Sequence, residues 1–213
     1  MNPISDFKIK TFVVGYIQTN MYLVVNNFQG IIIDPGFIAT EAEALIKKVA
    51  KESPEIPAVF LTHGHYDHIS GCNAVREKFQ SKIYCHRLDQ DKLLNGERSG
   101  ALLFPAGENP SFEGVEYLEG GEVIKLINLS FEIICTPGHT SGGVSIFMEN
   151  KFLFSGDTIF KDAIGRTDLY DGSYESEISS IKNKIFSLPS DTIIYPGHGP
   201  KTTVGQEKKY FNY

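Results

Sequence analysis

The segment Thr62–His68, with the sequence Thr-His-Gly-His-Tyr-Asp-His, places three histidines and one aspartate within six consecutive residues. It directly follows the apolar run Ala58–Leu61, which has the composition of a buried β-strand. Histidine is the commonest metal ligand near neutral pH, and an aspartate among such ligands favours zinc, manganese or iron over the softer copper(I). The pattern therefore predicts a metal site in a turn that leaves a strand.

The spacing within this segment predicts two points of coordination. His63 and His65 can point the same way across the small Gly64, whereas Asp67 and His68 begin the next helix and face a second point. One short segment can therefore contribute ligands to two ions. The alternative is a polar surface loop whose histidines are satisfied separately by hydrogen bonds, and it matches this density of ligand-type residues poorly.

Three more candidate ligands follow other strand-like runs. Phe131–Cys135 precedes a Thr-Pro-Gly turn that ends in His139, and Thr192–Tyr195 precedes a Pro-Gly turn that ends in His198. Between them in the sequence, a further apolar run is closed by Asp157. Four separated strand ends therefore each deliver a ligand-type side chain.

The ordered motifs His-x-His-x-Asp-His, Gly-His-Thr, Ser-Gly-Asp-Thr and Pro-Gly-His resemble the metallo-β-lactamase superfamily from about Thr19 to the C-terminus. The resemblance implies two divalent ions, with zinc as the first expectation and iron or manganese as alternatives. It implies one metal held by His63, His65 and His139, a second held by Asp67, His68 and His198, and a bridging Asp157. The fold that it implies is a four-layer αβ/βα sandwich with two mixed β-sheets.

Hydrophobic periodicity is consistent with that fold. Alternating or apolar runs predict an antiparallel meander over residues 7–14, 20–26 and 30–33. Later strands are predicted at 115–117, 122–127, 129–135, 143–148 and 151–155, with a helix near 174–187. An earlier helix is predicted to begin at Thr40 as its N-cap, with Glu43 completing a capping box.

Within the superfamily, the chain is most similar to short members of the glyoxalase II branch, the hydroxyacylglutathione hydrolases. The segments Ile164–Leu169 and Pro196–Glu207 carry this similarity. It implies a thioesterase in which a metal-bound hydroxide attacks the thioester carbonyl, while Asp67 and Asp157 hold the metals and orient that hydroxide as catalytic residues. We expect residues 1–213 to form one domain without the helical C-terminal domain that contacts glutathione, so the thiol carrier stays open.

Two further residues are candidates for supporting roles. Arg166 is suited to bind a substrate carboxylate, although it can equally pair with Asp162 or Asp168. Asp34 follows another strand-like run and is suited to accept a hydrogen bond from a ligand histidine, although an aspartate before a proline is also a common turn former. His86 is expected to be structural.

The segment Asn95–Phe112 contains three glycines and two prolines around the apolar patch Ala101–Pro105. Long irregular loops in compact domains are often functional. It is predicted either as a lid that supplies an apolar wall for an acyl chain or as a loop that packs Phe104 into the core.

Composition excludes several classes of partner and compartment. The net charge of −6 argues against a nucleic-acid substrate, and no run approaches the ~20 apolar residues of a membrane span. The N-terminus lacks the pattern of a secretory signal, so we expect a cytoplasmic enzyme that acts on a small-molecule thioester, with its oligomeric state open. Three widely spaced cysteines make a disulfide framework improbable, and Cys72 is expected to be a packed side chain.

Three other functions fit parts of the same pattern. A persulfide dioxygenase of this fold would use one iron on His63, His139 and Asp157. A β-lactamase would be expected to show a secretory signal and often a cysteine at the bridging position. A metal-binding protein without catalysis would tend to lose ligands, yet all seven are present, and the hydrolase is preferred.

Overall fold

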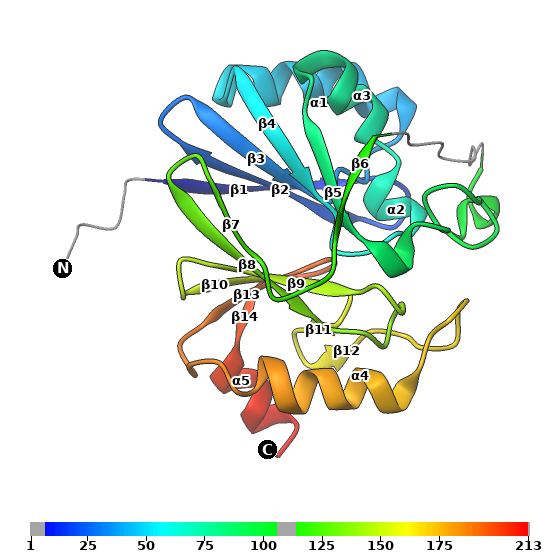
Figure 1. Cartoon of the computed structure of the whole chain (residues 1–213), viewed down its shortest axis with the longest axis vertical. Helices are drawn as coiled ribbons and strands as arrows, with labels where there is room; N and C mark the ends of the chain where they lie inside the picture. The colour runs from blue at the N-terminus through cyan, green and yellow to red at the C-terminus, as the bar shows by residue number, and fades with distance from the viewer. Residues whose placement is uncertain (1–6, 106–113, 213) are drawn as a thin grey trace.

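Two six-stranded sheets pack face to face and carry helices on both outer faces, as the computed structural model shows for residues 7–105 and 114–212 (Figure 1). The first sheet has the order β1 (Lys8–Val14), β2 (Thr19–Asn26), β3 (Gln29–Ile33), β4 (Glu55–Phe60), β5 (Lys82–His86) and β6 (Val115–Leu118). The second has the order β14 (Thr202–Thr203), β13 (Ile193–Pro196), β10 (Phe152–Gly156), β9 (Val144–Met148), β8 (Leu129–Cys135) and β7 (Val123–Leu126). Each sheet mixes parallel and antiparallel neighbours, which confirms the predicted four-layer αβ/βα sandwich.

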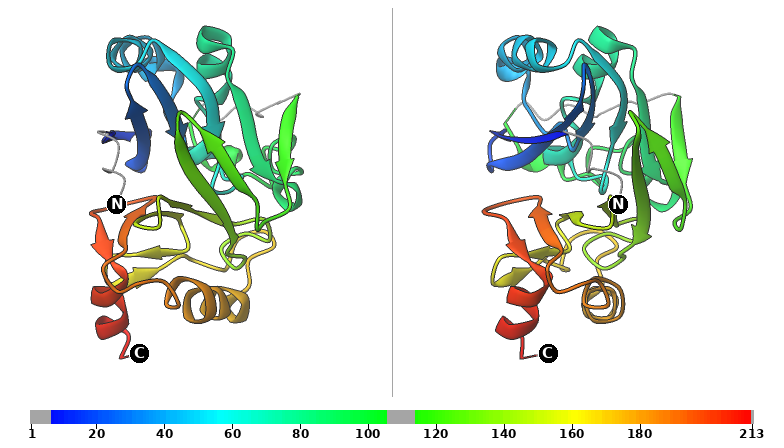
Figure 2. Two further views of the ribbon diagram at one scale, coloured as in Figure 1. Left: turned by 60° about the vertical axis from the view of Figure 1, so that its left-hand side comes forward. Right: turned by 90° about the vertical axis from the view of Figure 1, so that its left-hand side faces the viewer.

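The helices cover the outer face of each sheet, and the views of Figure 2 agree with this layering. The first sheet is covered by α1 (Ala39–Glu52) and α3 (Cys72–Phe79), and the short α2 (Tyr66–Ile69) lies at its edge. The second sheet is covered by α5 (Val204–Tyr210) and by α4 (Tyr174–Ser180), which continues as a π-helix over Ile181–Ile185. A small hairpin, β11 (Ile159–Phe160) and β12 (Ala163–Ile164), and two 3-10 helices, Arg87–Asp89 and Ala101–Leu103, complete the described elements.

The alternation of side chains along the strands divides the core into layers. On β3, Ile32 faces the helices of the first sheet, whereas Ile31 and Ile33 face the second sheet. On β10, Phe154 faces the first sheet, and Leu153 packs with the π-helix that continues α4 and with α5. Because successive side chains of a strand point to opposite faces, near-continuous apolar strands are required wherever both faces are covered.

The predicted meander and the later strands are confirmed close to their expected ranges, but the predicted start of α1 is wrong. The N-cap is Ile38, and Thr40 already lies inside the helix. The carboxylate of Glu41 accepts the N–H groups of Ile38 and of Gly15, each at 3.0 Å. This contact with a distant backbone group fixes the start of the helix, while Glu43 pairs instead with Lys47 on the surface.

The ends of strands from both sheets meet at one edge of the sandwich. The backbone N–H of Asn20 donates to the carbonyl of Gly197 at 2.7 Å, and that of Val144 donates to the carbonyl of Thr62 at 2.8 Å. These hydrogen bonds join segments of opposite sheets directly beside the predicted ligands. The edge therefore holds loops that are distant in sequence in a fixed relation to one another.

Within residues 7–105 and 114–212, none of the helices combines the length and the apolar character that crossing a membrane needs.

The aromatic contacts between the sheets give the first prediction. Phe131 is fully buried and its ring centroid lies 5.4 Å from that of Phe60. We expect Phe131→Ala to lower the free energy of unfolding by about 3–5 kcal/mol, because it removes apolar contacts and leaves a cavity. Denaturant unfolding measures this, with Phe28→Ala as a control on a side chain that is 60% exposed. Equal losses in both variants would contradict the assigned core.

Candidate metal centre

The seven predicted ligand side chains converge at the edge where the two sheets meet. Their ligand atoms form three overlapping groups, and within each group they lie within 4.8 Å of one another. The groups are His63, His65 and His139; His63, His68 and Asp157; and Asp67, His68 and His198. The first and the third group match the two predicted ligand sets. The arrangement thus brings together loops that follow β4, β8, β10 and β13.

Asp157 lies between the two sets. One of its carboxylate oxygens is 3.3 Å from His68 Nε2, and the other is 3.6 Å from His139 Nε2 and 3.5 Å from His198 Nε2. A single carboxylate therefore faces histidines of both sets. This is the geometry that a bridging ligand requires.

Two glycines allow the ligands to approach so closely. A Cβ atom on Gly197 would lie 2.0 Å from a carboxylate oxygen of Asp157 and 2.7 Å from a ring carbon of His68. A Cβ atom on Gly64 would lie 2.7 Å from Cβ of Lys92. A larger residue at either position would displace the ligands or their support.

Several buried atoms of the centre have no hydrogen-bond partner. They are His63 Nε2, His68 Nε2 and Asp157 Oδ1. An unsatisfied polar atom in a protein interior costs about 1–3 kcal/mol. A bound cation would satisfy these atoms together, so the donor set fits a metal.

The pair His65 and His139 supports the same conclusion. Nδ1 of His139 lies 2.7 Å from the backbone carbonyl of Arg166, and since a carbonyl only accepts, this nitrogen is the donor. In the neutral ring Nε2 of His139 then carries a lone pair, and it faces Nδ1 of His65 at 2.8 Å. Two ring nitrogens that converge in this way are suited to one metal ion.

Asp34 fixes the orientation of two other histidines. It accepts a hydrogen bond from His68 Nδ1 at 3.0 Å and one from the hydroxyl of Thr62 at 2.7 Å. Because the Thr62 hydroxyl donates to Asp34, it accepts from Nδ1 of His63 at 3.0 Å. Nε2 of His63 therefore points into the centre as an acceptor, and Nε2 of His68 points into the centre between the carboxylates of Asp67 and Asp157, at 3.2 and 3.3 Å. Asp34 also has the left-handed φ of +51°, so the predicted turn and the predicted support coincide in one residue.

Burial and neighbouring charges shift the pKa values of the candidate ligands in different directions in the two sets. Burial, reinforced by His139, lowers the pKa of His65 to about 3, so this ring is neutral. Burial also opposes a charge on His198, but Asp157 and Asp67 raise its pKa to about 9. Although burial alone would raise the pKa of Asp157, His68 and His198 hold it well below its usual range. Burial also lowers the pKa of His63, whereas Asp67 and Asp157 raise the pKa of His68 against the effect of its burial. The carboxylates and the histidines with raised pKa values therefore gather around Asp67 and Asp157, away from His63 and His65.

A buried ion network, which the sequence reasoning missed, joins the ligand loops. Asp89 accepts hydrogen bonds from the N–H groups of Gly64 at 2.7 Å and Gly142 at 2.9 Å. Asp89 also pairs with the fully buried ammonium of Lys92 at 3.1 Å, and Lys92 reaches Asp171 at 2.6 Å. One network thus fixes the loops around His63, His139 and Arg166. The available signal was position, because Asp89 follows β5 at the edge where other ligands lie.

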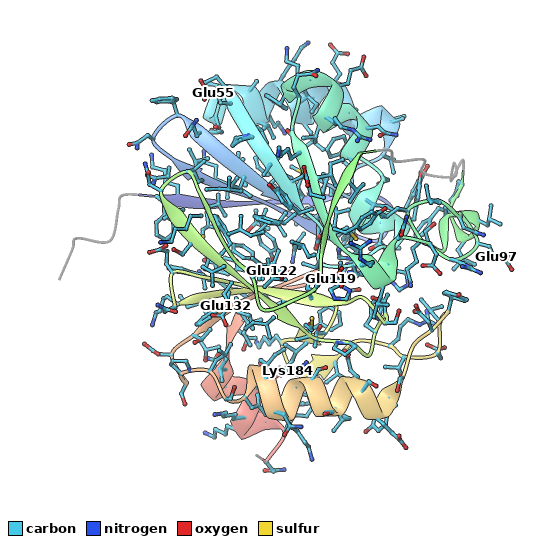
Figure 3. The ribbon with its side chains drawn as sticks, viewed as in Figure 1. Glu55, Glu97, Glu119, Glu122, Glu132 and Lys184 are labelled. Carbon is cyan, nitrogen blue, oxygen red and sulfur yellow. The ribbon has the colours of Figure 1, made fainter. Side chains whose placement is uncertain are left out.

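Helix α4 supports the loop of His139 from the other side. The buried carboxyl group of Glu177 accepts the backbone N–H of His139 at 2.9 Å, and burial raises the pKa of Glu177 to about 8. Lys184, farther along the same helix, donates to the carbonyl of Cys135 at 2.6 Å (Figure 3). The sequence reasoning missed both contacts because they join an outer helix to a strand end.

A cavity of about 130 Å³ adjoins the centre. Four predicted ligands line it, together with apolar and polar side chains from three other segments. Its lining consists of Ile17, His65, Asp67, Ser99, Gly100, Leu103, Phe104, His139, Asp157, Arg166 and Leu169. The cavity therefore gives a small molecule access to both ligand sets.

The segment predicted as a lid or a core loop forms part of this lining. Leu103 and Phe104 face the cavity, and the Phe104 ring contacts the rings of Tyr16 and Tyr66 at centroid distances of 6.1 and 5.5 Å. Phe104 is only partly buried, so the prediction that it packs into the core is wrong. Residues 106–112 of the predicted segment lie outside the described residues.

Arg166 lies at the cavity, as its predicted role requires, but its guanidinium is paired. It donates two hydrogen bonds of 2.8 Å to Asp168, and both side chains are exposed. This is one of the alternatives that the sequence left open. The backbone carbonyl of Arg166 holds His139, which gives this residue a second function.

Two other residues lie where they were expected. His86 remains outside the ligand groups, with Nδ1 accepting from the N–H of Leu88 at 3.3 Å and Nε2 at 3.6 Å from the Cys135 thiol. Cys72, the first residue of α3, is fully buried in the core between that helix and the first sheet. Both are structural side chains.

A family model described as the metallo-beta-lactamase superfamily matches residues 14–198. Hydroxyacylglutathione hydrolase GloC of Haemophilus influenzae is 38% identical over 180 residues, which cover 84% of each chain. Among solved structures, the B3 metallo-beta-lactamase BLEG-1 has a TM-score of 0.87 and 37% identity and covers 95% of this chain and 97% of that one. TTHA1623 in a di-iron-bound form has a TM-score of 0.81 and 30% identity and covers 94% and 98%. The similarity extends well beyond the ligand motifs.

The second prediction concerns metal content. The protein loaded with zinc, iron or manganese should hold about two ions per chain, and Asp157→Ala should lower that number because this carboxylate faces both sets. Elemental analysis after removal of excess metal measures it. His86→Gln is the matched control, since it changes a histidine outside the ligand groups. A full complement of metal in the Asp157 variant would exclude a bridging role.

The third prediction concerns the network beneath the ligands. Asp89→Ala should lower the free energy of unfolding by about 3–5 kcal/mol, because it leaves the buried charge of Lys92 with less compensation. Glu43→Ala, which breaks an exposed ion pair, should change it by about 0.5 kcal/mol or less. Denaturant unfolding of the metal-free proteins compares the two. Similar values for both variants would show that the network does not hold the loops.

Proposed function

The chain belongs to the metallo-beta-lactamase superfamily, and from this membership we propose that it is a dinuclear metal-dependent hydrolase that cleaves thioesters. The observation that carries the proposal is the position of Asp157. Its carboxylate faces both ligand sets and also lines the cavity. A thioester carbonyl in that cavity would lie against both sets at once.

The side chains of the protein would hold the metals and orient the reacting groups, and the metals would supply the electrophilic chemistry. Two bound divalent ions lower the pKa of water to near neutrality and stabilise negative charge on a carbonyl oxygen. Asp157 would contact both ions and so hold them in a fixed position relative to each other. Asp67 is fixed by a hydrogen bond of 2.8 Å from the Thr19 hydroxyl and lines the same cavity, where it is suited to orient the attacking oxygen and to accept its proton.

The leaving group needs little help from the protein. A thiol has a pKa near 8.5, so it departs as a thiolate without a dedicated general acid. This agrees with the cavity, where the titratable side chains are ligand candidates and Arg166. The site is therefore better suited to a thioester than to an amide, whose amine must be protonated as it leaves.

The similarity to a hydroxyacylglutathione hydrolase supports a hydroxyacyl thioester as the first substrate to test. We propose zinc as the first metal and retain iron, since a relative is known in a di-iron form. We also propose a cytosolic location. The three cysteines are free thiols, as is usual in a reducing compartment.

A mononuclear persulfide dioxygenase is the second candidate. One iron on His63, His139 and Asp157 would leave the group of Asp67, His68 and His198 without a metal. The presence of that complete second group favours the dinuclear hydrolase. A β-lactam should also be assayed as a substrate, because one of the similar solved structures is a metallo-beta-lactamase.

The fourth prediction tests the class of reaction. Metal-loaded enzyme should release free thiol from S-lactoylglutathione and from S-acetyl-N-acetylcysteamine in the absence of oxygen. Asp67→Ala should lower kcat by about 100-fold or more, because the variant loses a ligand candidate and the proposed proton acceptor. A thiol reagent measures the release under argon, and the Asp191→Ala variant is a control on an exposed aspartate outside the cavity.

Two parallel assays separate the alternatives. If the enzyme consumes oxygen with glutathione persulfide and cleaves no thioester, the proposed hydrolase is wrong and the dioxygenase is supported. Hydrolysis of a chromogenic cephalosporin without thioester cleavage would replace the thioesterase by a β-lactamase.

A further inference from the structure

We propose that the cavity beside the metal centre binds an uncharged aliphatic group of the substrate, so that the preferred thioester is apolar rather than anionic. This inference rests on the proposed thioester hydrolysis and specifies its substrate class. Two independent observations support it: the apolar wall of the cavity, and the ion pair that Arg166 of the cavity lining forms with Asp168.

The apolar wall comes from three separate segments. Ile17 lies in the turn between β1 and β2, Leu103 and Phe104 lie at the 3-10 helix, and Leu169 lies in the loop after β12. Leu103 is 74% exposed and Ile17 is 49% exposed. Exposed apolar side chains that face a cavity next to reactive groups favour a ligand that removes them from water.

The wall is tied to the metal ligands. The backbone N–H of Tyr66, which stands between His65 and Asp67, donates to the carbonyl of Ser99 at 2.9 Å. The ring of Phe104 stacks on that of Tyr16 at a centroid distance of 6.1 Å and an interplanar angle of 16°. An aliphatic chain on this wall would therefore be held at a fixed distance from the reacting carbonyl.

The charges around the cavity do not favour an anion. Of the residues that line it, all within the described ranges, Arg166 is the only lysine or arginine. Both hydrogen bonds that Arg166 donates go to Asp168, so a substrate carboxylate would have to displace that partner. Arg98, next to the lining residue Ser99, is likewise paired with Asp91. A glutathione moiety, which has two carboxylates, would find no unpaired lysine or arginine in this lining.

The test uses full-length, metal-loaded enzyme and two series of neutral thioesters. The first series carries acetyl, butyryl or hexanoyl groups on N-acetylcysteamine, and the second carries acetyl groups on alkanethiols of increasing length. In the series whose variable half contacts the wall, kcat/KM should rise about twofold for each added methylene group. Full burial of a methylene group would give about a fourfold rise, and the expected value corresponds to half of that free energy.

Two neighbouring leucines provide a matched pair of variants. Leu103→Ser should reduce the ratio of kcat/KM between the longest and the shortest substrate by several fold, since it removes part of the wall. Leu102 is 71% exposed and does not line the cavity, so Leu102→Ser should leave the ratio unchanged. A ratio near one in both series, or equal effects of the two variants, would overturn the proposal.

A charged analogue tests the second observation. It is made in the series that shows the length dependence: an adipoyl thioester is compared with the hexanoyl thioester in the acyl series, and the acetyl thioester of 6-mercaptohexanoate with that of hexanethiol in the thiol series. The thioester with the carboxylate should be cleaved at least tenfold less efficiently than its uncharged counterpart. Asp168→Asn should narrow this difference because it releases Arg166 from its carboxylate partner. Equal use of both thioesters by the wild-type enzyme would contradict an uncharged pocket. Hydrolysis of no thioester at all would refute the proposed function, whereas cleavage without length or charge preference would refute only this inference.

Discussion

The structure depends on a set of buried histidine nitrogens and carboxylate oxygens that converge on one small volume. His63 Nε2 and His68 Nε2 have no hydrogen-bond partner, and the ring nitrogens of His65 and His139 converge at 2.8 Å. Such a group is unfavourable in a protein interior unless a cation occupies it, and its geometry is kept only if the surroundings are rigid. The two sheets and their covering layers provide that rigidity, because the ligand loops are short extensions of buried strands.

Three buried carboxylates hold the ligand loops from below. Asp34 fixes His68 directly and His63 through Thr62, Asp89 holds the backbone of the first loop, and Glu177 holds the backbone of His139. They come from the end of β3, the 3-10 helix after β5 and helix α4. Each carboxylate satisfies N–H or O–H groups that would otherwise be unpaired, so the same contacts stabilise the fold and set the ring orientations of the ligands.

The candidate ligands and the apolar side chains of the cavity belong to different parts of the molecule. The ligand side chains rest on the sheets and their supporting carboxylates, whereas the apolar side chains of the cavity rest on surface turns and a 3-10 helix. Loops of this kind tolerate sequence change more readily than buried strand ends. If the cavity binds the substrate as proposed, changes at positions such as Ile17 and Leu103 would alter its selectivity without disturbing the candidate ligands.

The sequence by itself determined the types and the order of the candidate ligands, because their local spacing can be read along the chain. The layered fold was implied by the resemblance of the ordered motifs to the metallo-β-lactamase superfamily, and the two-residue period of the strands agrees with it. It also indicated Asp34, since a polar residue at a strand end lies at the ligand edge. Only the tertiary structure decided which partners meet across that edge. Glu41 rather than Glu43 caps α1 because it also reaches Gly15, and Arg166 pairs with Asp168. The roles of Lys92 and Glu177 cannot be read from the sequence because they arise from contacts between residues far apart in the chain, and only the position of Asp89 after a strand indicated its role.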